Sequence, residues 1–252
     1  LIEDMQILSG DLVSNGDFSQ EGSELITNGD FATDSDWTLG TGVTISGGKA
    51  NWTNTINNVG VQQSGIMTSG KNYKVVFTVS NYSSGSVRIR FPSITERITS
   101  NGTYTYYINA TDTQLYIQGE TNGDSNINFS IDNVSVKEVG QDWAFANADI
   151  SIGNDGLEII SQGGNRPQAN QNISGLTIGN KYKLSAVAKR GTCVEPVEIE
   201  IAGIGSTVNT NKNNTTEFKN IFYEFTASST THTIQAKIDD GASTVGETAF
   251  FK

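Results

Sequence analysis

Apolar and polar residues alternate with a period of two along most of the chain. From Tyr73 to Val79, every second side chain is apolar and falls on one face. From Val87 to Phe91 the same alternation places Arg88 and Arg90 on the face opposite the apolar residues. This period is typical of half-buried β-strands. Because no stretch shows a sustained apolar stripe at helical spacing, the sequence predicts an all-β protein.

Glycine-rich turn sequences separate these predicted strands. Examples are Ser-Gly-Gly at 46–48, Asn-Gly at 101–102 and Asn-Gly-Asp at 122–124. Such residues mark turns because glycine and asparagine accept backbone conformations that other residues avoid. Many short strands at this spacing indicate antiparallel β-sandwiches or barrels.

A long repeat lies beneath the alternation and indicates two copies of one domain. The matching segments are Asp36-Trp37 with Asp142-Trp143, Gly70–Lys74 with Gly179–Lys183, Val87–Phe91 with Val197–Ile201, and Tyr106–Gln118 with Tyr223–Gln235, the last aligned without a gap. We therefore predict an N-terminal segment at 1–24, a first β-sandwich at 25–140 and a second at 141–252. Ala249–Lys252 aligns with the start of Phe129–Val136, so the printed sequence is expected to end inside the last strand of the second domain.

A shorter repeat stands at the start of the chain. Leu12-Val-Ser-Asn-Gly-Asp-Phe18 returns as Leu25-Ile-Thr-Asn-Gly-Asp-Phe31. We call these two segments the entry phrases. Only the second directly precedes a sandwich, so the first is interpreted as the vestige of a shuffled array. A sharper hypothesis is that Leu12–Phe18 contributes an entry strand to another domain or to a neighbouring chain.

Composition excludes several classes of function. The chain of 252 residues carries a net charge of −11 without a basic cluster, which argues against nucleic acid and anionic membranes as partners. No apolar run reaches the ~18–20 residues of a membrane span, so no membrane insertion is expected. With one cysteine and one histidine, neither an intrachain disulfide nor a Cys/His zinc site is possible.

Four motifs of the chain together resemble a known group of protein domains. They are the entry phrase, the Trp that follows it, the Gly-x-x-Tyr-x-Val-x-Phe strand at 70–77 and the closing Phe129-Ser-Ile-Asp-Asn-Val-Ser-Val136. They are similar to jelly-roll carbohydrate-binding modules of the type of families 4, 9 and 22. The tandem form most resembles structural proteins of marine bacteriophages, such as tail fibres and head fibres. These motifs are marks of a fold and are only weakly specific for a ligand.

This resemblance implies a non-catalytic protein of the virion surface or extracellular space that adheres to host or environmental glycans. It also implies other virion proteins as partners and a homo-oligomer. One alternative is a purely structural or assembly module of a phage particle. Another is an accessory carbohydrate-binding module of a secreted polysaccharide-degrading enzyme. No organic cofactor is expected.

Sugar binding needs a flat aromatic ring together with planar polar groups. If the segment from Tyr104 to Gln118 forms a hairpin, Tyr107 and Tyr116 come to lie opposite each other on the outer face. Gln118, Arg88 and Arg90 share that face and complete a candidate glycan platform. The alternative is a cross-strand aromatic pair that only stabilises the sheet, by ~0.2–1 kcal/mol.

The second copy carries Glu224 and Thr233 at the aligned tyrosine positions, and Glu198 and Glu200 at the arginine positions. The platform is therefore predicted for the first domain alone. The opposite charges also allow the arginines of one chain to meet the glutamates of a neighbouring chain in a homo-oligomeric fibre, although solvated faces are the simpler interpretation.

Two further candidates come from the resemblance. Family members use an aromatic residue near Trp52 for binding, although its parity with Ala50 favours the core. They also hold a structural calcium, for which Asp30 and Asp132 are the candidate ligands. The acidic residue that usually follows the entry phrase is replaced by Ser19 and Ala32, so turn and strand-end roles for the two aspartates are the alternative.

Catalysis finds little support in the sequence. His232 aligns with Leu115, an inward position where a core or rim imidazole is expected. Cys193 has no histidine nearby in the sequence and is predicted to be a loop or semi-buried thiol. We therefore predict that the protein is not an enzyme.

Overall fold

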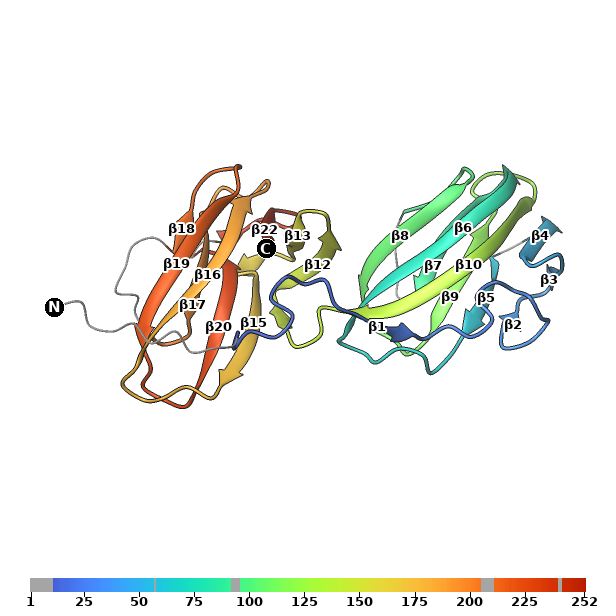
Figure 1. Ribbon diagram of the computed structural model, residues 1–252. Helices are drawn as coiled ribbons and strands as arrows, with labels where there is room; N and C mark the ends of the chain where they lie inside the picture. The colour runs from blue at the N-terminus through green and yellow to red at the C-terminus, as the bar shows by residue number, and fades with distance from the viewer. Residues whose placement is uncertain (1–10, 57, 92–95, 205–210, 240–241) are drawn as a thin grey trace. The chain divides into compact units, whose positions relative to one another are not determined.

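The computed structural model describes residues 11–56, 58–91, 96–204, 211–239 and 242–252, and within these ranges it contains β-strands and no helix (Figure 1). It follows that the described residues contain no helix able to cross a membrane. The strands belong to two compact units. We call Glu21–Val139 the continuous unit, and residues 11–20 together with Gly140–Lys252 the split unit. This division differs from the predicted succession of 1–24, 25–140 and 141–252.

The continuous unit consists of two antiparallel sheets. The first has the strand order β3-β4-β10-β6-β8, with β1 paired to β10, and the second has the order β2-β5-β9-β7. The strands are β1 (Glu21–Glu24), β2 (Thr38–Leu39), β3 (Val43–Ile45), β4 (Ala50–Thr55), β5 (Val59–Gln63), β6 (Asn72–Ser84), β7 (Ser86–Phe91), β8 (Gly102–Asn109), β9 (Leu115–Glu120) and β10 (Ile127–Val139).

The split unit repeats this plan. Its sheets have the orders β12-β13-β22-β16-β19 and β11-β15-β20-β17-β18, and a two-stranded ribbon joins β14 to β21. The strands are β11 (Ala144–Ala146), β12 (Ala148–Gly153), β13 (Gly156–Ser161), β14 (Gly164–Asn165), β15 (Gln168–Ser174), β16 (Lys181–Arg190), β17 (Val197–Ile201), β18 (Lys212–Asn213), β19 (Lys219–Thr226), β20 (Thr231–Ile238), β21 (Ala242–Ser243) and β22 (Thr248–Phe251).

Strand by strand, the sheet orders of the two units correspond. β4-β10-β6-β8 matches β13-β22-β16-β19, and β5-β9-β7 matches β15-β20-β17. Consecutive strands such as β8 and β9 belong to different sheets, so the chain crosses between the layers as it does in a jelly roll. The prediction of two antiparallel jelly-roll sandwiches is confirmed.

Alternating residues of both sheets fill each core, as the period-two pattern predicts. In the continuous unit Trp52, Phe77 and Ile117 are fully buried, and in the split unit Leu157 and Phe251 are. Each fully buried side chain of this size contributes ~1.5–3 kcal/mol through removal of apolar surface from water. The cores therefore hold the two sheets of each unit together.

The two entry phrases pack in the same way, one in each unit. Phe31 is buried in the continuous unit with its ring centroid 5.0 Å from that of Trp37. Phe18 is buried in the split unit with its ring centroid 5.0 Å from that of Trp143. Tilted aromatic pairs at this separation contribute ~0.5–1.5 kcal/mol beyond their burial. Each phrase thus provides one buried aromatic side chain to the core of one sandwich.

The polar contacts of the two phrases are repeated as well. Trp37 Nε1 donates to Asn28 O at 2.9 Å, and Trp143 Nε1 donates to Asn15 O at 3.1 Å. Both asparagines have the positive φ that asparagine tolerates in turns, 51° and 47°. Equivalent contacts at two places 13 residues apart in sequence (15 and 28) show that the doubled phrase is one structural device used twice.

Two buried glutamines hold the phrases in place. Gln63 Nε2 donates to Thr27 O at 2.6 Å, and Gln171 Nε2 donates to Ser14 O at 2.7 Å while its Oε1 accepts from Ser14 N at 2.8 Å. The interpretation of Leu12–Phe18 as a vestige is therefore wrong. The sharper hypothesis is correct that this phrase belongs to another domain, the one that resumes at Gly140. It is wrong about the form, because residues 12–18 lie in turns and not in a strand.

Candidate functional site

The second sheet of the continuous unit carries a row of polar side chains on β5, β9 and β7. We call this row the polar face; its members are Gln62, Arg88, Arg90, Tyr116, Gln118 and Glu120. They have the opposite parity to the core residues Leu115 and Ile117 of the same sheet. The pairing of strands brings them together, because Tyr116 lies opposite Gln62 and Gln118 lies opposite Arg88.

The amide of Gln118 has a fixed orientation. Its Nε2 donates to Asn58 O at 3.0 Å, and its Oε1 accepts from Arg90 Nη1 at 3.4 Å. The side chain is only 2% exposed. A buried planar amide with both ends bonded holds its neighbours in one arrangement, and here it positions the guanidinium of Arg90 beside Tyr116.

Two arginines neutralise the carboxylate of Glu120. Arg88 Nε lies 2.8 Å from Oε1, and Arg97 Nε lies 2.8 Å from Oε2. Glu120 is 7% exposed, so its charge would be costly to bury without these partners. The remaining guanidinium nitrogens are planar donors of the type that bind hydroxyl and carboxylate oxygens.

Tyr116 is the aromatic residue of the polar face. Burial raises the pKa of its phenol, while the positive charge of Arg90 opposes this shift. The half-buried ring therefore carries a neutral hydroxyl at physiological pH. A ring with a polar tip, bordered by fixed planar polar groups, can stack on the apolar face of a pyranose and hydrogen-bond its hydroxyls.

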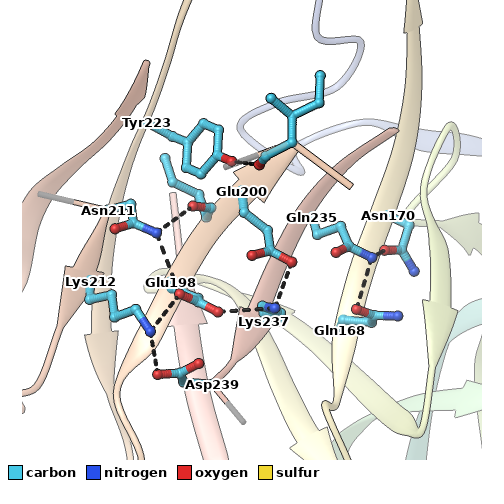
Figure 2. A network of polar contacts seen from close by, with 12 residues as sticks. Gln168, Asn170, Glu198, Glu200, Asn211, Lys212, Tyr223, Gln235, Lys237 and Asp239 are labelled. Atoms are coloured by element: carbon cyan, nitrogen blue, oxygen red, sulfur yellow. Dashed lines mark hydrogen bonds and ion pairs between the residues drawn. The ribbon is translucent and has the colours of Figure 1, made fainter. Parts of the chain in front are cut away.

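The corresponding face of the split unit carries polar side chains of β15, β20, β17 and β18 that contact one another (Figure 2). Lys237 Nζ lies 2.6 Å from Glu200 Oε1 and 3.0 Å from Glu198 Oε1. Lys212 Nζ lies 3.0 Å from Glu198 Oε2 and 2.5 Å from Asp239 Oδ2. These charges are satisfied by one another within the sheet.

Amide groups make a further set of contacts on the same face. Gln235 Nε2 donates to Gln168 Oε1 at 3.1 Å and to Asn170 Oδ1 at 3.0 Å (Figure 2). No aromatic side chain is part of this row of described residues on β15, β20 and β17. Hydrogen-bonding groups are thus present on the split unit, but a stacking ring is not.

Burial and hydrogen bonding have opposite effects on the pKa values of the central ion pair, Glu198 and Lys237. Burial raises the pKa of Glu198, and hydrogen bonds from Lys237 and Lys212 only partly offset that shift. Burial alone would lower the pKa of Lys237, but its bonds to Glu200 and Glu198 outweigh this effect and raise the pKa. The lysine is therefore charged and committed to its two carboxylates.

The strand registers of β5–β9 and β15–β20 correct the sequence alignment of Tyr106–Gln118 with Tyr223–Gln235. Gln63 and Gln171 hold their entry phrases in the same way, and they pair with Leu115 and Ile234 respectively. Ala110 and Ala227 also correspond, since each carbonyl accepts from the glycine before its Tyr-containing strand. The second connection is thus two residues longer (Ala227 to Ile234 against Ala110 to Leu115). Tyr116 corresponds to Gln235, not to Thr233.

The predicted pairing of Tyr107 with Tyr116 is wrong. Tyr107 lies on β8 and pairs with Lys74 of β6, whereas Tyr116 lies on β9 and pairs with Gln62 of β5. The segment between them crosses from one sheet to the other instead of forming a hairpin. Tyr107 is therefore not part of the polar face, while the structure brings Tyr116, Gln118, Arg88 and Arg90 together.

Trp52 is not available to a ligand. It is 2% exposed, its ring centroid lies 4.6 Å from that of Phe129, and its Nε1 donates to Val59 O at 3.0 Å. Its inclusion among the binding candidates is wrong, and the core position that its parity with Ala50 favoured is correct.

Three residues of this region, Gln62, Glu120 and Arg97, were not predicted from the sequence. A signal existed for Glu120, because it shares the parity of Tyr116 and Gln118 on one strand. Gln62 could be found only once the β5–β9 register was known. Arg97 lies outside the named strands, so no periodicity pointed to it.

The two candidate calcium ligands make local contacts. Asp30 Oδ1 accepts from Ala32 N at 3.3 Å, and Asp132 Oδ1 accepts from Asn133 N at 2.6 Å. In the described ranges, no three His, Cys, Asp or Glu residues gather in a way that could hold a metal ion. The calcium site stays a prediction, for which a melting curve with and without EDTA is the measurement.

His232 and Cys193 have structural surroundings. His232 Nε2 accepts from Ser228 N at 3.2 Å and from Ser229 N at 3.3 Å, so the imidazole closes the turn before β20. It lies two residues before the position that corresponds to Leu115. Cys193 is buried, and burial raises the pKa of its thiol, which disfavours the reactive thiolate.

Comparison with known proteins identifies no family. No protein-family model matches the chain, and no curated protein matches it. Among solved structures, it is similar to the tandem CBM22-1–CBM22-2 domain of Xyn10C from Paenibacillus barcinonensis. That similarity has 12% identity and a TM-score of 0.34, and it covers 93% of this chain and 99% of the other.

Two further solved structures show weaker similarity. A protein in the structure of Sulfolobus Turreted Icosahedral Virus has 12% identity and a TM-score of 0.26, over 86% of this chain and 58% of the other. The GH2 β-galacturonidase of Eisenbergiella tayi has 11% identity and a TM-score of 0.25, over 69% of this chain and 30% of the other. TM-scores this low carry no argument about function.

Proposed function

We propose that the protein is a non-catalytic glycan-binding protein and that the polar face of the continuous unit is its binding surface. The observation that carries this proposal is the position of Tyr116, a neutral ring beside Arg90 and the fixed amide of Gln118. Groups already held in place lose little freedom when a ligand binds. One such ring gives weak binding to one sugar.

Weak binding fits an adhesive role in which many copies act together. Linked weak sites gain ~10²–10⁴ in avidity when their geometry permits simultaneous binding. We place the protein on a virion surface, as a fibre or decoration module that adheres to host or environmental glycans. The resemblance of its tandem motifs to phage structural proteins supports this placement, and other virion proteins and further copies of the chain are the partners proposed with it.

A second candidate role applies to the split unit. Its corresponding face has no aromatic ring, and its charges are occupied by the pairs Lys237–Glu198 and Lys212–Asp239. This favours a structural or assembly role for that unit, also under the alternative that the chain is an accessory module of a polysaccharide-degrading enzyme. The arginine–glutamate contact between chains is less favoured, because Arg88 and Glu198 both have partners within their own unit.

The test is a glycan array probed with the wild type, Tyr116→Ala and Tyr107→Ala. We expect Tyr116→Ala to weaken binding about tenfold or more, because stacking on the ring is lost. Tyr107→Ala is the matched control, since this half-buried tyrosine lies on the other sheet, and it should bind like the wild type. Loss of binding in Tyr107→Ala but not in Tyr116→Ala would overturn the proposed surface, and a wild type that binds no glycan would favour the structural role.

A further inference from the structure

The polar face of the continuous unit carries a surplus of positive charge. Arg88 and Arg90 belong to it, and Arg97 is held at its edge by Glu120, the one acidic member of the face. These are three of the five arginines in a chain whose net charge is −11. A local surplus of one sign attracts ligands of the opposite sign. The polar face is therefore suited to an anionic ligand, although the chain as a whole is acidic.

Glu120 compensates only part of this charge. The Nε atoms of Arg88 and Arg97 each lie 2.8 Å from one of its oxygens, so two guanidinium groups share one negative charge. Glu96, the neighbour of Arg97 in the chain, is hydrogen-bonded instead to a tyrosine of β8, in the other sheet. The side chain of Arg97 is 46% exposed, and Arg90 is exposed as well. Positive charge is thus accessible to a ligand at both residues.

A β-bulge brings Arg90 to the ring of Tyr116. The register of β7 and β9 shifts between Ile89 and Phe91, and Phe91 is the residue that pairs with Tyr116. Arg90 is therefore the extra residue of the bulge, a distortion that redirects a side chain. Gln62 pairs with Tyr116 from the opposite side, on β5. The aromatic residue thus lies between a cationic group and a neutral amide.

These two flanking groups suit different parts of a sugar. The partly exposed amide of Gln62 has no hydrogen-bond partner among the described residues, so its donor and its acceptor are available to hydroxyl groups. The guanidinium of Arg90 has planar donors that match the oxygens of an anionic group. A pyranose ring stacked on Tyr116 would meet a hydroxyl-binding group at one edge and an anion-binding group at the other.

The split unit provides an internal comparison. Glu198 and Glu200 of β17 occupy the places of Arg88 and Arg90 of β7, because the paired strands have corresponding registers. There the two glutamates are bound to Lys237. The same sandwich is therefore built with either sign of charge at these positions. The positive charge of the continuous unit is a property of its surface and not a requirement of its fold.

We propose that the ligand of the polar face is an acidic glycan, with a sugar unit that stacks on Tyr116 and bears a carboxylate or a sulfate ester that accepts hydrogen bonds from Arg90. Gln62 binds hydroxyl groups of the same unit, and Arg97 adds to the positive potential of the surface. The assignment rests on the proposed glycan-binding function and names the class of glycan. The acidic face of the split unit does not bind this ligand.

The first test is an array of acidic polysaccharides, each printed in its native form, in a carboxyl-reduced form and in a desulfated form. Both treatments remove charge and keep the sugar rings. We expect the wild type to bind native forms and to lose about tenfold or more of its affinity for a neutralised form. Loss on carboxyl reduction assigns a uronate, and loss on desulfation assigns a sulfate ester. Equal binding of native and neutralised forms would overturn the proposal.

The second test is a calorimetric titration of variants with the native glycan that binds best. Arg90→Gln should weaken binding of the native form about tenfold or more and leave the neutralised form unchanged. Arg90→Lys keeps the charge without the planar donors and should fall between the two. Lys71→Gln is the matched control, because it removes an exposed cation outside the polar face. Since Arg90 is exposed, the melting temperature of Arg90→Gln should equal that of the wild type.

The outcomes separate this proposal from the glycan-binding function itself. If Tyr116→Ala weakens binding and Arg90→Gln does not, the binding surface stands and the acidic ligand is wrong. If the wild type binds no glycan in any form, both fail. A second copy of the chain is the competing occupant, through Glu198 and Glu200. Self-association of the wild type that Arg90→Gln abolishes, measured by light scattering, would assign the face to that copy and overturn the proposal.

Discussion

Phe18→Ala is expected to destabilise the split unit by about 3–5 kcal/mol, although residue 18 is separated by more than 100 residues from the rest of its core. The ring is 3% exposed and packs on Trp143 at 5.0 Å. Its removal leaves a cavity and also ends the aromatic contact. The midpoint of thermal unfolding of this unit should fall by about 10 °C or more.

Hydrogen exchange followed by peptide assigns the loss to one unit. Exchange should increase in β15, β16 and β20 of the split unit and stay unchanged in β4 and β6 of the continuous unit. Leu12→Ala is the matched control in the same segment, because Leu12 is 37% exposed and its truncation should cost little. Normal unfolding of the split unit in Phe18→Ala would show that the first entry phrase has no structural role.

Lys237→Met is expected to destabilise the split unit by about 3–5 kcal/mol. The methionine fills a similar volume, but Glu198, whose side chain is 4% exposed, loses one of its two cations. Glu200 loses its 2.6 Å contact with the same lysine. Breaking one side of a buried ion pair leaves an uncompensated charge, and that penalty exceeds the net value of the pair.

Replacing both partners separates the two effects. The double variant Lys237→Met/Glu198→Leu should recover most of the lost stability in a chemical denaturation curve, because the buried carboxylate of Glu198 is then gone and only the more accessible Glu200 lacks its lysine. Lys71→Met is the control: its pair with Glu138 is exposed, with side chains 50% and 27% accessible, and its loss should cost no more than ~1 kcal/mol. A double variant less stable than the single one would contradict this account of the network.

The sequence alone was sufficient to predict the strands and their faces, since a period of two assigns each side chain to one side of a sheet. It was not sufficient to predict which strands are neighbours. Tyr107 and Tyr116 were assigned to one surface because their strands are adjacent in sequence, yet β8 and β9 belong to different sheets. Gln118, Arg88 and Arg90 were assigned correctly because their strands, β9 and β7, do pair.

The role of the first entry phrase was hidden by its distance from its own domain. The phrase ends at Phe18, and its tryptophan partner is Trp143. Local periodicity carries no information about a contact across an inserted domain. The sequence did contain one clue to this role, because the number of entry phrases equals the number of sandwiches. Trp143 has no phrase directly before it, so the phrase at 12–18 is the one left for the second sandwich. Such insertions are tolerated because the two termini of an inserted domain often lie close together.

The polar face as a glycan-binding surface is tested most directly by NMR. The isotope-labelled protein is titrated with the glycan that gives the strongest array signal, and the perturbed side chains and amides are mapped. We expect the largest shifts at Tyr116, Gln118 and Arg90 on β9 and β7, with none at Tyr107 on β8. Shifts centred on Tyr107 and Lys74, or confined to the split unit, would contradict the assignment.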